Sequence, residues 1–347
     1  MHRRFKRALY ALALLGFVLG AAACRQADAG SVASSTAKPT RAPQWTHAPV
    51  AILVSPTPDP YAALTIEGLA ARPYGGGQVQ VHETLETTAR FTRYLISYPS
   101  DGLTIYGFMN VPHGEGPFPV VIAVHGYVTP SRYNTLDYTT RYADDLARAG
   151  YLVLHPNLRG YRPSDDGPNP FRIGSAIDVL NLIALVRQQG GQPGPLQQAR
   201  SDAIGLWGHS MGGGIAIRVM TVSQDVRATV LYGSMSASER DNYERIRMWS
   251  EGTSGRAELN TPEEALRRIS PIYHLDRVQA AVSIHHGEAD DTVPLAWSQD
   301  LCARLQALGK DVTCYTYAGQ PHTFQGAGDR LFVERTIAFF DAQLREP

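Results

Sequence analysis

The sequence predicts an α/β protein built on a mostly parallel sheet with helices on both faces. Three observations support this prediction: short, nearly continuous apolar segments, helical patterns between the later ones, and one tight turn between the first two. Strands that are apolar on both faces and alternate with helices are typical of a parallel sheet covered on both sides. No internal repeat is visible in the 347 residues.

The predicted elements alternate through most of the chain. The strands are RYLISY (93–98), LTIYGFMNV (103–111), PVVIAVH (119–125), YLVLHPN (151–157), AIGLWGH (203–209), ATVLYG (228–233), AVSIHHG (281–287) and VTCYTYAG (312–319). The helices are TTRYADDLARAG (139–150), GSAIDVLNLIALVRQQ (174–189), GGGIAIRVMTV (212–222), LAWSQDLCARLQALG (295–309) and LFVERTIAFFDAQL (331–344). Only PSDG separates the first two strands, which predicts an antiparallel hairpin at the start of the sheet.

Composition and charge exclude several classes of protein. A hydrophobic content of 44% suits a globular fold and argues against a disordered or fibrous chain. Lysine and arginine together number 32, as do aspartate and glutamate, so the chain has no overall basic field that would hold nucleic acid. We therefore expect no nucleic-acid partner.

The N-terminus has the pattern of a targeting segment. A basic head (residues 3–7) precedes an uncharged run (8–23) that is too short for an ordinary membrane span, which predicts a signal peptide over residues 1–23. The run ends in AAAC, which resembles a bacterial lipobox, although Ala21 stands where that motif usually has leucine. The resemblance implies that Cys24 is lipidated and anchors an extracytoplasmic protein to the cell membrane. Plain secretion and an uncleaved anchor are the alternatives.

Residues 24–60 are rich in alanine, serine, threonine and proline and show little periodic apolar pattern. Such a segment cannot bury enough apolar surface to offset the entropy lost on ordering. We expect it to form a flexible, lipid-anchored tether. A single folded domain is then expected over residues 61–347.

The segment GHSMG joins a predicted strand to a predicted helix. In that context, glycines that flank a serine at this spacing form the nucleophile elbow of the α/β-hydrolases, and a chance match is the alternative. The elbow would lift the hydroxyl of Ser210 above the sheet edge, while Gly208 and Gly212 leave room for a neighbouring strand and helix. The helix N-terminus favours a developing negative charge, and Met211 supplies the amide next to the nucleophile. The sequence therefore predicts an α/β-hydrolase fold with Ser210 as nucleophile.

A serine nucleophile needs a base, and the base needs an acid that orients it. In this fold the chain order is serine, then aspartate or glutamate, then histidine. The segment HHGEADDTVP follows a predicted strand and offers Asp290, with Asp291 as its main competitor. The segment GQPHTF follows the next strand and offers His322, the only histidine after this acid. The sequence predicts a triad of Ser210, Asp290 and His322.

A metal site formed by His285, His286 and Asp290 is an alternative for the same segment. Adjacent residues of a strand point to opposite faces of the sheet, so the two histidines cannot readily bind one ion. We therefore expect no metal and no organic cofactor.

These motifs resemble the catalytic domain of the prolyl oligopeptidase family. The run "HG, two residues, Asp, two residues, VP" is similar to the acid motif of that family and assigns the acid to Asp290, and PHTF is similar to its histidine loop. The resemblance covers residues 90–344. It implies a serine hydrolase that acts through an acyl-enzyme on amide or ester bonds of a small peptide or ester substrate.

Three functions remain open from this resemblance. Peptidases of the family usually carry a large propeller, for which the stretch between residue 60 and the first predicted strand is too short. A compact serine peptidase and a carboxylesterase with the same triad are both compatible with the sequence. A non-catalytic surface lipoprotein that keeps the fold for binding is the alternative from another class.

Two loops are expected to border the active site. The loop after VVIAVH reads HGYV, where Tyr127 replaces the second glycine often found in the family. Its backbone N–H is predicted to be the second oxyanion donor, and the alternative role for Tyr127 is an aromatic wall of the pocket. The loop NLRGYRPSDDG (157–167) resembles a family loop beside the active site. Its Arg159 is expected to be structural rather than substrate-binding, because buried arginines usually pair with nearby acids and carbonyls.

Two further features stay open. If Cys24 is lipidated, Cys302 and Cys314 remain as a pair in an oxidising compartment, one in a predicted helix and one in the next strand, where they could lie opposite each other. A disulfide and two buried thiols are the alternatives. The charged segment within residues 236–280 is either a small lid or a surface helix on an ordinary connection.

Overall fold

The computed structural model describes residues 58–345, and the chain from Pro58 onward forms one compact unit. The predicted signal peptide, Cys24 and most of the predicted tether lie outside the described residues. Within residues 58–345, no helix has both the length and the apolar character needed to cross a membrane.

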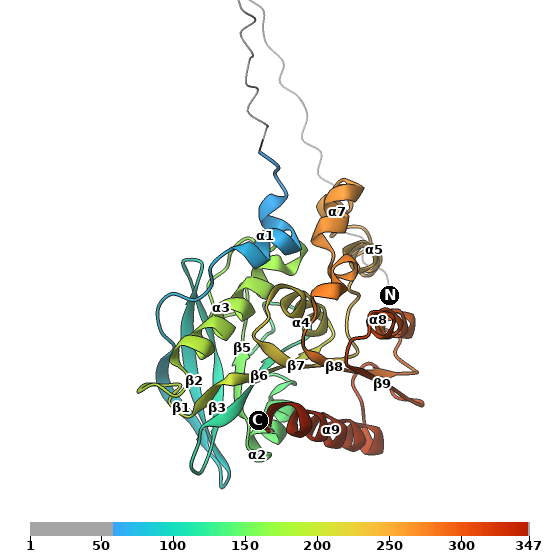
Figure 1. Ribbon diagram of the computed structural model, residues 1–347. Coiled ribbons are helices and arrows are strands. Elements are labelled where there is room, and N and C mark those ends of the chain that lie inside the picture. Colours follow the sequence, from blue (N-terminus) through green and yellow to red (C-terminus); the bar gives the residue numbers. More distant parts are fainter. Residues whose placement is uncertain (1–57, 346–347) are drawn as a thin grey trace, which may run out of the picture. The chain divides into compact units, whose positions relative to one another are not determined.

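Nine strands of the described chain form one sheet (Figure 1), in the order β1-β2-β3-β5-β4-β6-β7-β8-β9. The strands are β1 (Gln80–Thr87), β2 (Phe91–Ser100), β3 (Leu103–Pro112), β4 (Phe118–Val124), β5 (Leu152–Pro156), β6 (Ala199–His209), β7 (Val226–Tyr232), β8 (Ala281–Gly287) and β9 (Val312–Tyr317). β1, β2, β3 and β5 pair antiparallel, whereas the pairs from β5 through β4 to β9 are parallel. This is the α/β-hydrolase fold predicted from the sequence.

Helices cover both faces of the sheet. They are α1 (Ile66–Ala71), α2 (Thr140–Arg148), α3 (Ile173–Gln189), α4 (Met211–Val222), α5 (Glu239–Trp249), α6 (Arg256–Leu259), α7 (Glu263–Ile269), α8 (Leu295–Ala307) and α9 (Gly326–Phe340). Short 3₁₀ turns are η1 (Ala62–Leu64), η2 (Pro170–Arg172), η3 (Pro271–Tyr273) and η4 (Leu275–Arg277), and a π turn, η5 (Asp341–Arg345), ends the described chain.

Two apolar cores result, one on each face of the sheet. Buried residues of α1, α3, α4 and α8 form one core with the sheet, and those of α2 and α9 form the other. Figure 1 shows α3 and α4 on the opposite side of the sheet from α2 and α9. Strand β4 supplies both cores, because Val120 and Ile122 face the first and Val121 and Ala123 face the second. Burial on both faces explains why its sequence is continuously apolar.

The N-terminal hairpin has the tight turn that the sequence predicted. Ser100 pairs with Leu103, so Asp101 and Gly102 alone connect β2 to β3, and both have positive φ (50° and 83°). Two central residues with positive φ are typical of the type I′ turn that suits the twist of a hairpin. The short turn sequence therefore accounts for the antiparallel pairing of β2 with β3.

Strand β1 was not predicted from the sequence. Its segment QVHETLET lies at the edge of the sheet and is mostly exposed, so it lacks the apolar alternation of a half-buried strand. Its pairing with β2 also shifts register twice, which removes a regular pattern. Strand β1 is therefore held in the sheet by its pairing with β2 rather than by burial of an apolar face of its own.

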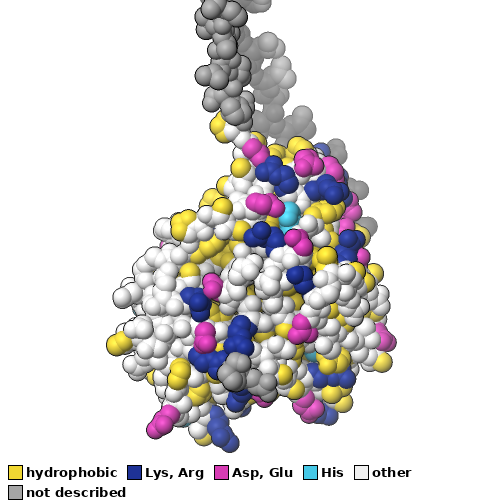
Figure 2. Space-filling model, in the orientation of Figure 1, with side chains coloured by type: hydrophobic (Ala, Val, Ile, Leu, Met, Phe, Trp, Pro, Cys, Tyr) yellow, Lys and Arg dark blue, Asp and Glu magenta, His cyan; other side chains and the backbone are white. Residues whose placement is uncertain are grey.

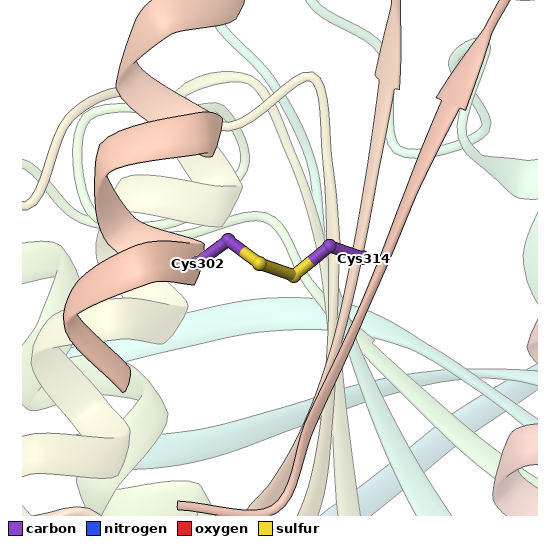
Figure 3. Close-up of a disulfide and its surroundings, with 2 residues drawn as sticks. All are labelled: Cys302 and Cys314. Atoms are coloured by element: carbon purple, nitrogen blue, oxygen red, sulfur yellow. A yellow bond between two sulfur atoms is a disulfide. The ribbon is translucent and has the colours of Figure 1, made fainter. Parts of the chain in front are cut away.

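A disulfide joins α8 to β9, the edge strand at the other end of the sheet from β1 (Figure 3). The sulfur atoms of Cys302 and Cys314 lie 2.04 Å apart, and their Cα atoms 6.4 Å. Of the two alternatives that the sequence left open, the structure has the bonded pair. The bond ties β9, which is mostly exposed, to the helix that packs against it.

Charged groups are mixed on the surface. On the face that Figure 2 shows, basic and acidic side chains are interspersed rather than gathered by sign. This distribution agrees with the equal numbers of basic and acidic residues in the whole chain.

Candidate active site

Ser210 occupies a strained turn between β6 and α4. Its φ of 55° and ψ of −116° lie outside the regions that residues with a side chain normally adopt. Four backbone hydrogen bonds hold it there. Its N–H donates to the Tyr232 carbonyl at 3.0 Å, and its carbonyl accepts from the N–H groups of Gly213 and Met235, each at 3.0 Å, and of Gly214 at 3.2 Å. A strained residue persists only where its surroundings fix it in this way, as at many functional sites.

The glycines around Ser210 allow close backbone approach. A β-carbon on Gly208 would lie 2.5 Å from the carbonyl oxygen of Gly212, and one on Gly212 would lie 2.1 Å from that of Val124. A β-carbon on Gly213 would lie 2.5 Å from the Ser234 hydroxyl. Real β-carbons do not approach other atoms so closely, so β6 and α4 can pack in this way only without side chains at these positions. The geometry is that of the predicted elbow.

Asp290 and His322 form a hydrogen-bonded pair. Asp290 follows β8 and His322 follows β9, and the carboxylate Oδ2 lies 2.7 Å from the imidazole Nδ1. The other carboxylate oxygen, Oδ1, accepts the backbone N–H groups of Thr292 and Val293 at 2.9 and 2.8 Å. The competitor, Asp291, instead accepts a bond from the hydroxyl of its neighbour Thr292. The structure therefore brings Asp290, and not Asp291, to the histidine.

The surroundings of Asp290 favour its ionised form. Burial opposes ionisation, but hydrogen bonds from His286, from His322 and from the backbone N–H of Val293 outweigh it, so the pKa of Asp290 lies below its usual value. The His286 Nε2 lies 3.2 Å from Oδ2 of the carboxylate. An ionised acid beside Nδ1 fixes the tautomer in which Nε2 of His322 is free to accept a proton.

The pair lies at the same edge of the sheet as Ser210. A β-carbon on Gly233, which directly follows β7, would lie 3.2 Å from Nδ1 of His322 and 3.4 Å from Oδ2 of Asp290. Ser210 is hydrogen-bonded to the residue before this glycine, Tyr232. Within the described chain, no hydrogen bond joins the Ser210 hydroxyl to the His322 ring; such bonds are often long in proteins without substrate.

A second network connects the histidine loop to the loop after β4. The Tyr138 hydroxyl accepts the Gly126 N–H at 3.0 Å, so its own proton points to Nδ1 of His209, 2.8 Å away. His209 then carries its proton on Nε2 and donates it to the His322 carbonyl at 3.0 Å. Burial, together with the nearby His322, lowers the pKa of His209 to about 3, which keeps the ring neutral. Sequence reasoning did not assign a role to His209 or Tyr138.

A cavity of about 580 Å³ opens beside Ser210. Both residues predicted to supply oxyanion donors, Met211 and Tyr127, line it. Among the described residues, neither of their backbone N–H groups has a hydrogen-bond partner. The Tyr127 side chain is 65% exposed, so the residue also forms part of the cavity wall, as the alternative for it proposed.

Arg159 lines the cavity and forms a buried ion pair. Its Nη2 lies 2.8 Å from Oδ1 of Asp178, and its Nη1 donates to the Pro168 carbonyl at 3.0 Å. Ser100 donates to the same carboxylate at 2.7 Å. Arg159 therefore joins β2, α3 and the loop after β5, which agrees with the structural role expected for it.

The segment 236–280 forms one wall of the cavity. Ile246 and Trp249 of α5 line it, together with Ser250 and Ser254. Arg218 of α4 is fully buried and joins this segment to the nucleophile helix through Glu239, at 2.6 Å, and through the Ile269 carbonyl, at 2.8 Å. This segment is part of the site rather than an ordinary surface connection.

The histidines considered for a metal site have protein partners on different sides. His285 bonds the hydroxyls of Ser283 and Tyr317, whereas His286 bonds the Ser298 hydroxyl and the Val293 carbonyl. In the part of the chain that the structure describes, no group of three or more histidine, cysteine or acidic side chains is arranged to hold a metal ion.

The fold and the site together define the class: the chain has the α/β-hydrolase fold, with a serine elbow and an aspartate–histidine pair at the carboxyl ends of its parallel strands. Comparison with known families agrees. Residues 195–346 match the model of the prolyl oligopeptidase family, and residues 119–263 match that of the alpha/beta hydrolase fold. The chain thus has the α/β-hydrolase fold, and its C-terminal part is similar to the prolyl oligopeptidase family.

Two related proteins match this chain over 66–70% of its length. An uncharacterized peptidase, YtmA, of Bacillus subtilis is 24% identical over 251 residues, which are 70% of this chain and 90% of that protein. A putative carboxymethylenebutenolidase of Synechocystis is 22% identical over 242 residues, 66% of this chain and 85% of that protein.

Solved structures with the same fold include peptidases and esterases. A puromycin-hydrolyzing peptidase of Mycobacterium tuberculosis is 20% identical (TM-score 0.55), and an acylaminoacyl peptidase of Pyrococcus horikoshii is also 20% identical (TM-score 0.59). The matches cover 74% and 75% of this chain but only 40% and 43% of those chains. Acetyl xylan esterase 1 of Thermoanaerobacterium is 17% identical, with coverage of 81% and 91% and a TM-score of 0.57.

Proposed function

We propose that this protein is a serine hydrolase that cleaves peptide, aminoacyl amide or ester bonds through an acyl-enzyme. The observation that carries the proposal is the Asp290–His322 hydrogen bond of 2.7 Å at the sheet edge where Ser210 sits in its elbow. The cavity beside Ser210 supplies room for a substrate group. The match to the prolyl oligopeptidase family supports the same chemistry.

Each residue has a defined role in this mechanism. His322 removes the proton of the Ser210 hydroxyl as the oxygen attacks the substrate carbonyl, and Asp290 stabilises the imidazolium that forms. The N–H groups of Met211 and Tyr127 donate to the oxyanion. His322 then gives its proton to the leaving group, and water, activated by the same histidine, later releases the acyl group from Ser210.

A carboxylesterase with the same triad is the second candidate. It is supported by the likeness in fold to the acetyl xylan esterase, which the match covers over 91% of its length. The triad itself supports either reaction, since attack on an amide and attack on an ester pass through the same tetrahedral intermediate. A substrate library of peptides and esters separates the two candidates.

We also propose that the enzyme is anchored outside the cytoplasm. Support comes from the sequence: the basic head and apolar run of residues 1–23, followed by AAAC, are typical of an exported lipoprotein. Lipidation of Cys24 would attach the catalytic domain to the cell membrane through residues 24–60.

The test of the proposed function is the replacement of the nucleophile. We expect Ser210→Ala to lower the hydrolysis of short acyl esters and aminoacyl amides by about four to six orders of magnitude, because the acyl-enzyme cannot form. Ser223→Ala is the matched control, since Ser223 caps the other end of α4. A fluorophosphonate probe should label the wild type and Ser223→Ala but not Ser210→Ala.

Equal rates for the wild type and Ser210→Ala would rule out Ser210 as the nucleophile. An unlabelled wild-type protein without hydrolytic activity would instead favour the binding protein that keeps the fold.

A further inference from the structure

Arg172 is a charged side chain in the cavity that the proposed mechanism does not use. It lines the same cavity as Ser210, and 15% of its side chain is exposed. Among the described residues, its guanidinium group donates no hydrogen bond, although its Nη2 is closed off from solvent and its Cζ lies 5.2 Å from the centre of the Tyr243 ring. It forms a long ion pair with Glu239, whose Oε2 lies 3.7 Å from Nη2. A guanidinium group that is largely buried and donates no hydrogen bond does not recover the free energy lost when its water is removed.

Glu239 cannot neutralise Arg172 alone, because it is shared. Its Oε1 already accepts the buried Arg218 at 2.6 Å, so two guanidinium groups face one carboxylate. The other cavity arginine, Arg159, has Asp178 as its own partner. The Asp166 carboxylate also lines the cavity, but it is exposed and accepts the N–H of the adjacent glycine. The network of Arg172, Arg218 and Glu239 therefore carries a net charge of +1.

The start of α3 adds to this positive character. The helix has 17 residues, no acidic residue in its first turn, and no side-chain cap from Arg172, which directly precedes it. Ser175 of the first turn and Asn169, which accepts the Ser175 N–H at 3.0 Å, both line the cavity. The positive end of a helix dipole thus lies at the same wall as Arg172, and both favour an anion.

The rest of the cavity wall is largely apolar. Tyr161, Met211, Met235, Ile246 and Trp249 contribute to it. A volume of about 580 Å³ exceeds the need of a small acyl group such as acetyl, so a longer substrate group fits. The site therefore combines a nucleophile, an apolar wall and a cationic wall within one cavity.

We propose that this cavity selects ester or amide substrates with an apolar body that ends in a carboxylate, and that Arg172 binds this carboxylate while Ser210 attacks the carbonyl. The inference rests on the proposed function, because it names the substrate class of that same site. Arginine suits this role, since its guanidinium group keeps its charge at all ordinary pH values and a hydrogen bond from it to a carboxylate is of the stronger, charge-assisted kind.

The experiment compares substrate pairs that differ only in the carboxylate. On the acyl side, the pair is the 4-nitrophenyl hemiester of adipic acid and the corresponding ester of its monoamide. On the leaving-group side, the pair is the butyrate ester of 4-hydroxybenzoic acid and that of 4-hydroxybenzamide. In one of the two pairs we expect the wild-type kcat/KM to be at least about tenfold higher for the carboxylate, because a hydrogen bond between ionised partners is the stronger kind. The pair that responds tells which end of the substrate Arg172 receives.

Variants then assign the preference to the residue. In Arg172→Gln the ratio within the responding pair should fall to about one, and Arg172→Lys, which keeps the charge, should restore part of it. Arg240→Gln is the matched control, because Arg240 lies on α5, pairs with Glu263 on the surface and does not line the cavity. It should keep the wild-type ratio. Should Arg172→Gln fail to fold, inhibition of the wild type decides: adipate should compete with substrate and adipamide should not.

Two results would overturn the proposal: ratios near one in both wild-type pairs, or a wild-type ratio that persists in Arg172→Gln. These outcomes differ from a failure of the proposed function. In that case Ser210→Ala would hydrolyse the neutral member of each pair as fast as the wild type does.

Discussion

Asp290 shows how neighbouring residues of identical chemistry acquire different environments. It lies in the turn after β8, where two backbone N–H groups and two histidines converge on its carboxylate. The next residue, Asp291, is exposed, and its carbonyl is one of the acceptors of Arg245 from α5. One position along the chain thus separates an acid that orients His322 from a carboxylate at the surface.

This difference gives a paired test. We expect Asp290→Asn to lower kcat by about 10⁴-fold, because an amide at this place favours the wrong tautomer of His322. Asp291→Asn should leave kcat within about twofold, since the Asp291 carboxylate touches neither His322 nor the cavity. Ester hydrolysis under saturating substrate measures both. A large loss in Asp291→Asn with normal activity in Asp290→Asn would move the acid to position 291.

The site residues differ in how far the sequence reveals them. Ser210, Asp290 and His322 could be predicted because the fold fixes their chain order and because short motifs surround them. Tyr138 and Arg172 could not, since each lies in a connection without a pattern and reaches the site only after distant segments pack. His209 stands next to the nucleophile, but only the structure shows its bonds to Tyr138 and to the His322 carbonyl.

At the scale of elements, the strand–turn–helix unit of β6 and α4 requires close contacts between the start of α4 and neighbouring segments. The three glycines at the start of α4 are not equivalent. Gly212 and Gly213 would place β-carbons 2.1 and 2.5 Å from other atoms, whereas one on Gly214 would lie 3.1 Å from Cβ of Met235. The severe contacts are therefore restricted to the first two glycines of the run.

Alanine substitutions should separate these positions. We expect Gly212→Ala to lower the free energy of unfolding by about 2–3 kcal/mol and to reduce activity, because β4 or α4 must shift to admit the methyl group. Gly214→Ala should change it by no more than about 1 kcal/mol, since the gain in helix propensity offsets a tight contact. Urea unfolding followed by circular dichroism measures both. Similar losses in the two variants would contradict the role of the backbone contact with Val124.

The predictability of the elements follows their burial. Strands β2 to β9 could be predicted because most are continuously or alternately apolar, and helices α2, α3, α4, α8 and α9 because they carry regular apolar positions. Helices α1, α6 and α7 have at most seven residues, too few for a periodic pattern to be reliable. α5 was recognised only as a charged helical run, and its contribution to the cavity comes from its packing.

At the scale of the whole molecule, the chain combines a catalytic domain with the predicted export and anchoring segment. We expect the full-length wild type, expressed in a bacterium, to be found in the membrane fraction and to incorporate labelled palmitate. Cys24→Ser should remove the label and release activity into the soluble fraction, because the acyl chains supply the membrane affinity.

Ser31→Ala, which alters the same segment but keeps the cysteine, is the control for that experiment. Retention of unlabelled Cys24→Ser in the membrane would instead support an uncleaved apolar anchor. Release of the wild type without label would support plain secretion.

The cross-link between Cys302 and Cys314 has a consequence for handling the enzyme. It closes a loop across a separation of twelve residues between the helix that follows the Asp290 turn and the strand that leads into the His322 turn. A covalent closure of this kind restricts the unfolded chain and so favours the native state. Buffers with strong reductants would remove that restriction beside the acid and the base at once, so purification without thiols preserves the molecule as the structure has it.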